Sequence, residues 1–272
     1  MIKKIIGIVV VLMVVAVGYV AFSFFRTPEE ASAPLEAIPV VVEEPTAAPA
    51  AAPAETTTEP VVEAAVPTEE AVAEPVAPAA EPESEVAAVE SSPVVFEIVP
   101  AESEVRFLID EVLRGADFTV VGVTDQVAGQ IAVDPADLSS AQMGPILVNA
   151  RTLATDNDFR NRALKNRILT TDEYEFITFT PTEIVGLSGS ATTGESYSFQ
   201  IVGDLTIRDV TRPVTFDATA SLASETQLVG SATVTVLYDD FNLTIPASEA
   251  VSAVDDDVRL EIDFVATAVE AS

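Results

Sequence analysis

The 272-residue sequence contains no cysteine, no histidine and no tryptophan. Without cysteine, the chain has no disulfide, no thiol nucleophile and no thiolate ligand for a metal. Without histidine, it has no Ser-His-Asp triad, no imidazole metal ligand and no imidazole proton shuttle. These absences remove the commonest catalytic and metal-binding arrangements, and we expect no enzymatic activity, no cofactor and no metal site.

Basic residues are also scarce, with 13 Lys and Arg against 44 Asp and Glu and a formal net charge of −31. Residues 1–26 carry three basic residues and no acidic one. Residues 27–93 carry 15 Glu and no basic residue, and residues 94–272 carry 29 acidic residues against ten basic ones. Nucleic-acid phosphates are bound by clustered Lys and Arg, so we expect no nucleic-acid partner.

Charged residues are missing altogether from Ile5 to Phe25, a run of 21 mostly apolar residues. As a helix this run spans about 31 Å, close to the roughly 30 Å hydrocarbon core of a bilayer. Lys3 and Lys4 precede it, which keeps residues 1–4 cytoplasmic and the rest outside, in the periplasm or at the cell surface. We predict a transmembrane anchor at residues 5–25. A cleaved signal peptide, with a shorter apolar region of about 7–15 residues, is the alternative.

Residues 26–93 form the next segment, and they contain 12 of the 18 prolines together with many Ala, Glu, Val and Thr. Proline removes backbone donors and the Glu side chains repel one another, so this composition cannot form a compact core. We predict a disordered linker that keeps the following domain away from the membrane.

Residues 94–272 show alternating apolar and polar side chains separated by turn residues, the pattern of half-buried antiparallel strands. The exception is residues 156–169, which predict one short helix. We expect an all-β domain, an eight-stranded antiparallel barrel with one short helix. Several inward positions are Gly or Ala, which either leaves space for a ligand or relieves crowding in a packed core.

Four segments of this domain resemble a known family. The most specific is GDLTIRDVTRPVTFD at residues 203–217, and three others support it: GVTDQVAGQI at 122–131, ARTLATDNDFRNRALKNRIL at 150–169 and DEYEFITF at 172–179. They are similar to the YceI-like family, whose members are lipocalin-like barrels that bind polyisoprenoid chains. The resemblance covers about residues 95–268.

The resemblance implies an isoprenoid-type or other long-chain lipid partner, such as a quinone-like one, in an apolar tunnel inside the barrel. Inward residues of the strands would line this tunnel: Phe107, Ile109, Phe118, Ile177, Phe179, Phe199, Ile201, Gly203, Phe216, Ala232, Val234 and Phe264. Many family members carry a Lys-His pair where this chain has Asp110-Glu111. A head group therefore cannot be held by an imidazole here.

Half of the basic residues of the acidic domain lie within 17 positions: Arg151, Arg160, Arg162, Lys165 and Arg167. One interpretation is a basic rim for a lipid head group at the tunnel mouth, and another is attraction to anionic lipid. The third is ion pairing with the neighbouring Asp156, Asp158, Asp172 and Glu173.

Two hypotheses for the function therefore stand side by side. The first is a membrane-anchored binding protein that holds a long apolar amphiphile outside the cytoplasm. The second is a structural or adhesive exterior domain with a closed core and no ligand. An apolar cavity of several hundred Å³ would separate them.

Overall fold

The computed structural model describes residues 26–40 and 93–269, together with five residues of the N-terminal run: Met13, Val15, Val17, Gly18 and Phe22. Most of the predicted anchor at 5–25, the stub at 1–4 and linker residues 41–92 lie outside the described residues. Among the described residues, no helix is both long enough and apolar enough to cross a membrane.

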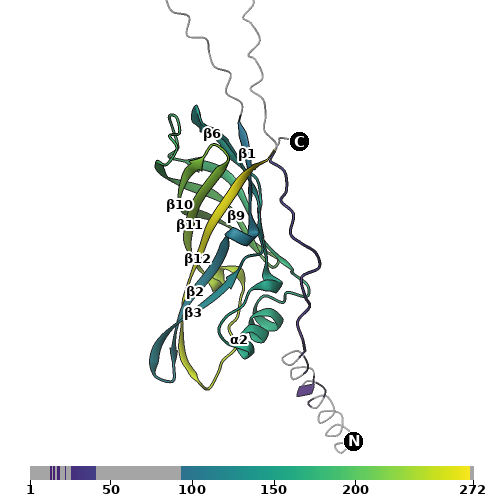
Figure 1. Ribbon diagram of the computed structural model, residues 1–272. Helices are drawn as coiled ribbons and strands as arrows, with labels where there is room; N and C mark the ends of the chain where they lie inside the picture. Colours follow the sequence, from purple (N-terminus) through teal and green to yellow (C-terminus); the bar gives the residue numbers. More distant parts are fainter. Residues whose placement is uncertain are drawn as a thin grey trace, which may run out of the picture. The chain divides into compact units, whose positions relative to one another are not determined.

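Residues 93–269 fold into β-strands joined by short helical segments (Figure 1). The strands are β1 (Val94–Ile98), β2 (Glu104–Leu113), β3 (Ala116–Thr124), β4 (Val127–Ala128), β5 (Gln130–Asp134), β6 (Asp137–Met143), β7 (Ile146–Asn149), β8 (Phe176–Val185), β9 (Ser196–Ile207), β10 (Val210–Ser224), β11 (Gln227–Leu237) and β12 (Val251–Val269). The helical segments are η1 (Pro100–Glu102), η2 (Ala150–Thr152), α2 (Asp158–Ala163), η3 (Leu164–Ile168) and η4 (Tyr238–Phe241).

All strands belong to one curled antiparallel sheet. Its order is β4-β7-β8-β9-β10-β11-β12-β1-β5-β6, and β2 pairs with both β12 and β3. β12 has 19 residues, of which Asp257–Thr267 pair with β11 along one edge, and the strand pairs with β2 and then β1 along the other edge. The last strand of the chain therefore pairs with the first two, which curls the sheet around an interior.

The domain has twelve strands and not the eight that the sequence predicts. Four interruptions account for the difference. The η1 turn at Pro100 separates β1 from β2, residues 125–126 and then Gly129 separate β3, β4 and β5, and residues 144–145 separate β6 from β7. The fragments keep common partners, since β1 and β2 both pair with β12, and β5 pairs with β6 as β4 pairs with β7. Proline cannot donate to a ladder, and Gly permits a sharp bend, which accounts for the breaks at Pro100, Gly129 and Gly144-Pro145.

The predicted alternation of inward and outward residues is confirmed in the long strands. In β11, Leu228 and Ala232 are buried, whereas Ser231 and Thr233 are exposed. The predicted short helix is also confirmed, as α2 continued by the π-helical turn η3. The Asn157 side chain begins it by accepting hydrogen bonds from the backbone N–H groups of Phe159 and Arg160.

Two inward glycines accommodate aromatic rings. A Cβ on Gly203 would lie 2.5 Å from the backbone oxygen of Thr180 and 2.7 Å from the Phe179 ring. A Cβ on Gly230 would lie 2.7 Å from the Phe264 ring. The small residues at these positions therefore serve close packing of the wall and leave no room for a ligand.

Apolar side chains fill one end of the curled sheet and line the other. At the first end, Phe96 and Ala266 are fully buried in a packed cluster that also contains Leu222 and Leu228. A second cluster lies toward α2 and includes Leu164, among side chains from several strands. Figure 1 shows α2 at the opposite end of the sheet from β6. The interior is thus closed at the first end and bordered by helix and loops at the α2 end.

The close contacts of Gly203 predict that Gly203→Ala destabilises the fold by about 1–3 kcal/mol, the usual cost of overpacking. Both the backbone oxygen of Thr180 and the Phe179 ring would have to shift. Gly129→Ala is the matched control, because the only atom within 3 Å of its new Cβ would be the terminal methyl of Ile146 at 2.2 Å, and that side chain can rotate. Urea unfolding measures both. Equal losses of stability in the two variants would contradict this account.

Candidate functional site

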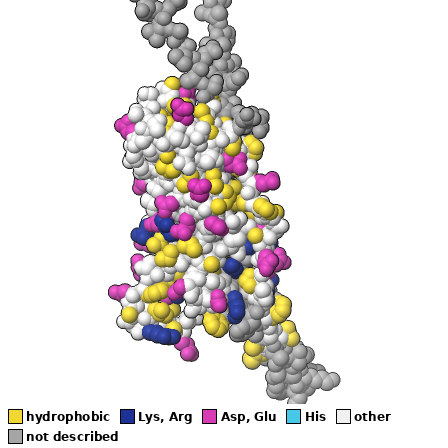
Figure 2. All heavy atoms as spheres, viewed as in Figure 1, with side chains coloured by type: hydrophobic (Ala, Val, Ile, Leu, Met, Phe, Trp, Pro, Cys, Tyr) yellow, Lys and Arg dark blue, Asp and Glu magenta, His cyan; other side chains and the backbone are white. Residues whose placement is uncertain are grey.

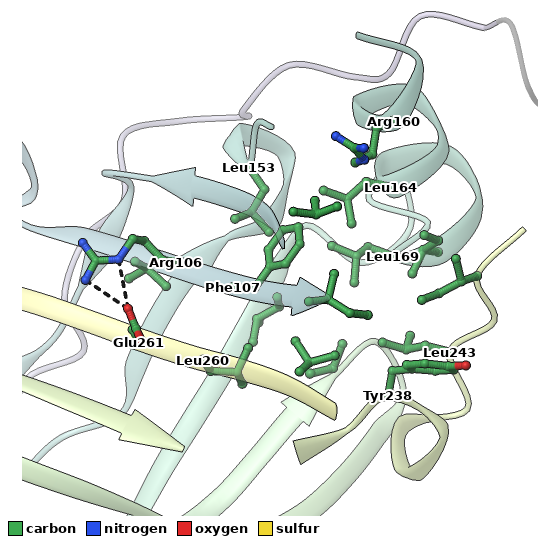
Figure 3. A pocket seen from close by; sticks show the side chains of 18 of the residues that line it. Arg106, Phe107, Leu153, Arg160, Leu164, Leu169, Tyr238, Leu243, Leu260 and Glu261 are labelled. Carbon is green, nitrogen blue, oxygen red and sulfur yellow. Dashed lines mark hydrogen bonds and ion pairs between the residues drawn. The ribbon is translucent and has the colours of Figure 1, made fainter. Parts of the chain in front are cut away.

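The curled sheet encloses a cavity of about 1060 Å³ that opens at the α2 end. Its walls are mainly aliphatic and aromatic side chains from β2, β8, β9, β10, β11 and β12. Figure 3 shows Phe107 of β2 pointing toward Leu153, Leu164 and Leu169, which follow or belong to the short helical segments. A large apolar cavity with few polar groups is the ordinary form of a binding site for an apolar molecule.

Eight of the twelve predicted tunnel residues line this cavity: Phe107, Ile109, Ile177, Phe179, Ile201, Phe216, Ala232 and Phe264. They come from six strands, and the structure brings them together around one space. The Phe179 and Phe216 rings meet edge to face, with centroids 4.9 Å apart. Strand alternation was sufficient to select these residues, because each inward position of a curled sheet faces the same interior.

The other four predicted tunnel residues lie elsewhere. Gly203 packs under the Phe179 ring, and Phe118 lies beside the mouth with the Arg160 guanidinium 5.7 Å from its ring centroid. Phe199 is half-buried against the apolar cluster of the α2 end. Val234 is half-buried in β11 opposite Leu260 of β12.

The mouth of the cavity carries one ion pair that is largely shielded from water. The Glu111 side chain is 8% exposed, and its Oε1 atom lies 3.0 Å from a terminal nitrogen of Arg160. Both residues line the cavity. Arg160 also pairs with Asp156, one helical turn earlier, at 2.5 Å. The Arg160 guanidinium is thus shared between two carboxylates, which leaves these three side chains with a net negative charge, while Arg106 and Arg114 also line the cavity.

Of the five residues of the predicted basic rim, Arg160 is the one that lines the cavity, and the others lie in different surroundings. Arg162 lies over the Phe159 ring at 5.6 Å. Burial lowers the pKa of Lys165, and Arg167 takes part in interactions of its own. Arg151 lies away from the cavity and binds residues 26–40. Figure 2 shows Lys and Arg mainly in the half of the visible face toward α2, whereas acidic side chains are scattered from one end of the face to the other.

The predicted ion pairs of this segment form in part. Asp156 pairs with Arg160, and Asp172 pairs with Arg26 of the N-terminal segment at 2.5 Å. Within the described residues, no three acidic side chains are grouped so as to hold a metal ion.

Several cavity residues had no signal in the sequence. Leu153 and Leu243 lie in irregular segments, and residues 245–248 border the mouth from the loop before β12. The segments that contain these residues show no apolar period of two or of 3.6 residues, so alternation could not select them. Glu111 follows the inward alternation of Phe107 and Ile109, and this position could have identified it as a charge that faces the mouth.

The shielded pair predicts that Arg160→Leu destabilises the protein, because Glu111 then keeps a charge with no partner. We expect a loss of about 1–3 kcal/mol near neutral pH. Adding Glu111→Gln should recover part of it, so that the double variant loses less than the sum of the two single ones. Arg162→Leu is the control, since its guanidinium contacts only the exposed Phe159 ring. Strict additivity in urea unfolding would show that the pair is not coupled.

The comparisons with known proteins agree with this architecture. The YceI-like domain matches residues 96–266. Burkholderia cenocepacia BcnA is similar in fold at 17% identity, over 62% of this chain and 98% of its own, with a TM-score of 0.50. A polyisoprenoid binding domain from Saccharophagus degradans, implicated in plant cell wall breakdown, is 13% identical over 65% of this chain and 100% of its own, with a TM-score of 0.49. No curated protein matches the sequence significantly. Since the family match spans more than half of the sequence, the chain belongs to the YceI-like family.

Proposed function

We propose that the domain is a binding protein that holds the apolar chain of a long amphiphile inside the curled sheet. The observation that carries the proposal is the cavity of about 1060 Å³, which is apolar in its depth and open at one end. A structural or adhesive domain with a closed core has no use for such a space. Membership in the YceI-like family supports a polyisoprenoid or quinone-like lipid as the ligand.

Apolar burial alone supplies enough free energy for this ligand. Each buried methylene contributes about 0.8 kcal/mol, so one five-carbon isoprene unit contributes roughly 3–4 kcal/mol. Association costs about 4–15 kcal/mol in lost freedom. A few buried units therefore outweigh that cost without any ionic contact, and affinity should rise with chain length.

The mouth favours a ligand whose head group is neutral. The Arg160 guanidinium already pairs with Glu111 and Asp156, so a phosphate head group placed beside Arg160 would also lie close to two carboxylates. An alcohol or quinone can instead accept or donate single hydrogen bonds among the same groups. We therefore propose a neutral isoprenoid rather than a prenyl diphosphate, and no chemical conversion of it.

The domain is proposed to work outside the cytoplasm while remaining attached through residues 5–25. Support comes from the charge asymmetry. Lys3 and Lys4 precede the apolar run, whereas all charged residues from 27 to 93 are acidic. A ligand carrier near a membrane has direct access to the lipid that it binds.

Filling the cavity should abolish binding without unfolding the domain. Ala232→Leu places three extra carbons on the cavity wall, because Ala232 lines the cavity and is 8% exposed. Ser231→Leu is the matched control on the same strand, since Ser231 faces outward. In titrations with isoprenoid alcohols of increasing length, the parent and Ser231→Leu should bind more tightly as the chain grows, with little dependence on salt, and Ala232→Leu should not bind. Equal binding by both variants would place the ligand outside the cavity.

The absence of cysteine gives a direct test of topology. Ser188→Cys lies in the exposed segment after β8, and Ile2→Cys lies in the predicted cytoplasmic stub. A membrane-impermeant maleimide applied to intact cells should label the first variant at the size of the full chain. The second should be labelled only after permeabilisation. Labelling of a shortened, freely soluble Ser188→Cys product would instead indicate cleavage of the apolar run.

A further inference from the structure

Residues 26–40, called the strap below, lie along the domain in irregular backbone and are held by a polar site built around Arg151. The Arg151 guanidinium donates four hydrogen bonds and also forms ion pairs. Within the domain, the Thr171 carbonyl accepts from it at 2.9 Å and the Asp172 carbonyl at 3.2 Å, and the Glu175 carboxylate forms an ion pair with it at 3.1 Å. The strap supplies the other two acceptors, the carbonyl of Glu30 at 3.1 Å and the carboxylate of Glu29 at 2.9 Å.

Glu175 is a second anchoring point for the strap. Its two oxygens accept from the backbone N–H and the hydroxyl of Ser32, both at 2.8 Å, and it also accepts from the Asn149 amide. Burial acts to raise the pKa of Glu175, but the Ser32 and Asn149 hydrogen bonds and the Arg151 charge outweigh it and lower the pKa. Docking of the strap is therefore stabilised above the ordinary carboxyl pKa and weakens as the pH falls through the lowered value.

The end of the strap nearest the N-terminus is fixed to the helical segment that lines the cavity mouth. The buried Asn166 side chain of η3 donates to the Arg26 carbonyl at 2.9 Å, and the Arg26 side chain pairs with Asp172. Leu164 and Ile168, on either side of Asn166, line the cavity. Phe159 stands seven residues before Asn166, or about 10 Å of helix, and it is 65% exposed although it borders the mouth.

The described residues of the apolar N-terminal run are helical. The backbone N–H of Arg26 donates to the Phe22 carbonyl at 2.9 Å, which is the spacing of an α-helical bond. The described large side chains of this run are exposed by 61–67%: Met13, Val15, Val17 and Phe22. An apolar helix with every described large side chain outward is suited to lipid and not to a protein core.

We infer that the strap seats the cavity mouth against the lipid bilayer that holds the N-terminal run, so that the exposed Phe159 and the neighbouring loop at residues 246–247 meet the bilayer surface. Lipid then enters the cavity from the membrane without crossing water. The linker residues after the strap do not set the distance between mouth and membrane, because Arg26 is already fixed beside the mouth. This inference rests on the proposed lipid-binding function and adds the partner surface and its orientation.

A single tryptophan tests the orientation, since the chain has none of its own. The full-length Phe159→Trp protein is placed in phosphatidylcholine vesicles that carry a doxyl quencher near the headgroup. Its emission should fall severalfold relative to vesicles without the quencher. The control is Glu225→Trp, at the exposed turn between Leu222 and Leu228 of the closed end, and its emission should stay unchanged. No quenching of Phe159→Trp, or equal quenching of both variants, overturns the inference.

Strap variants test the cause while leaving every residue of the barrel in place. Glu29→Lys opposes the Arg151 charge, and Ser32→Pro removes both hydrogen bonds to Glu175. When both substitutions are added to the Phe159→Trp protein, the quenching of its tryptophan should be mostly lost. Unchanged quenching would overturn the role of the strap. Native mass spectrometry of the same samples reports bound lipid separately. Quenching without bound lipid would support the orientation and refute the proposed function. Bound lipid without quenching would support the proposed function and refute the orientation.

Discussion

The pairing of β12 is the constraint on which the rest of the structure depends. This strand pairs with β11 from Asp257 to Thr267 and with both β2 and β1 along its other edge, so the first and last strands of the domain meet. Along that seam, Arg106 pairs with Glu261 directly across the strands and with Asp263 and Glu104, and both Arg106 and Glu261 also line the cavity (Figure 3). Hydrogen bonds to these carboxylates, with Glu104 the strongest, outweigh burial and raise the pKa of Arg106. Without this seam the sheet would open, and the inward apolar residues would lose the space that they enclose.

Two different ends follow from the same curled sheet. One end is filled by packed side chains such as Phe96 and Ala266, and the other stays open because α2, η3 and the loop before β12 border the interior without filling it. The polar groups of the open end are mostly paired among themselves. Arg160 is shared by Glu111 and Asp156, and Arg151 is surrounded by the strap and by Glu175. Selectivity for an apolar chain with a neutral head group is the expected result of this arrangement.

The sequence predicted the features that depend on local periodicity. Alternation selected most of the inward residues that line the cavity, and its interruption at residues 156–169, which contain neither Gly nor Pro, predicted the short helix. It failed where contacts between distant segments decide the outcome. From the sequence, Gly203 was interpreted as a small residue that leaves space for a ligand, but the Phe179 ring from the neighbouring strand occupies that space. The sequence placed Arg151 in the predicted basic rim, yet its partners Glu29 and Glu30 lie more than a hundred residues away in the chain. No spacing rule connects such positions, because only the folded chain brings them together.

The central claim is that the cavity holds the chain of a neutral isoprenoid lipid. Native mass spectrometry of the full-length protein, extracted gently from its own membrane, tests it most directly. The account predicts a population whose extra mass is that of one lipid per chain, released as a neutral isoprenoid and absent from Ala232→Leu. A protein that carries no lipid, or that carries the same lipid after Ala232→Leu, would contradict the account.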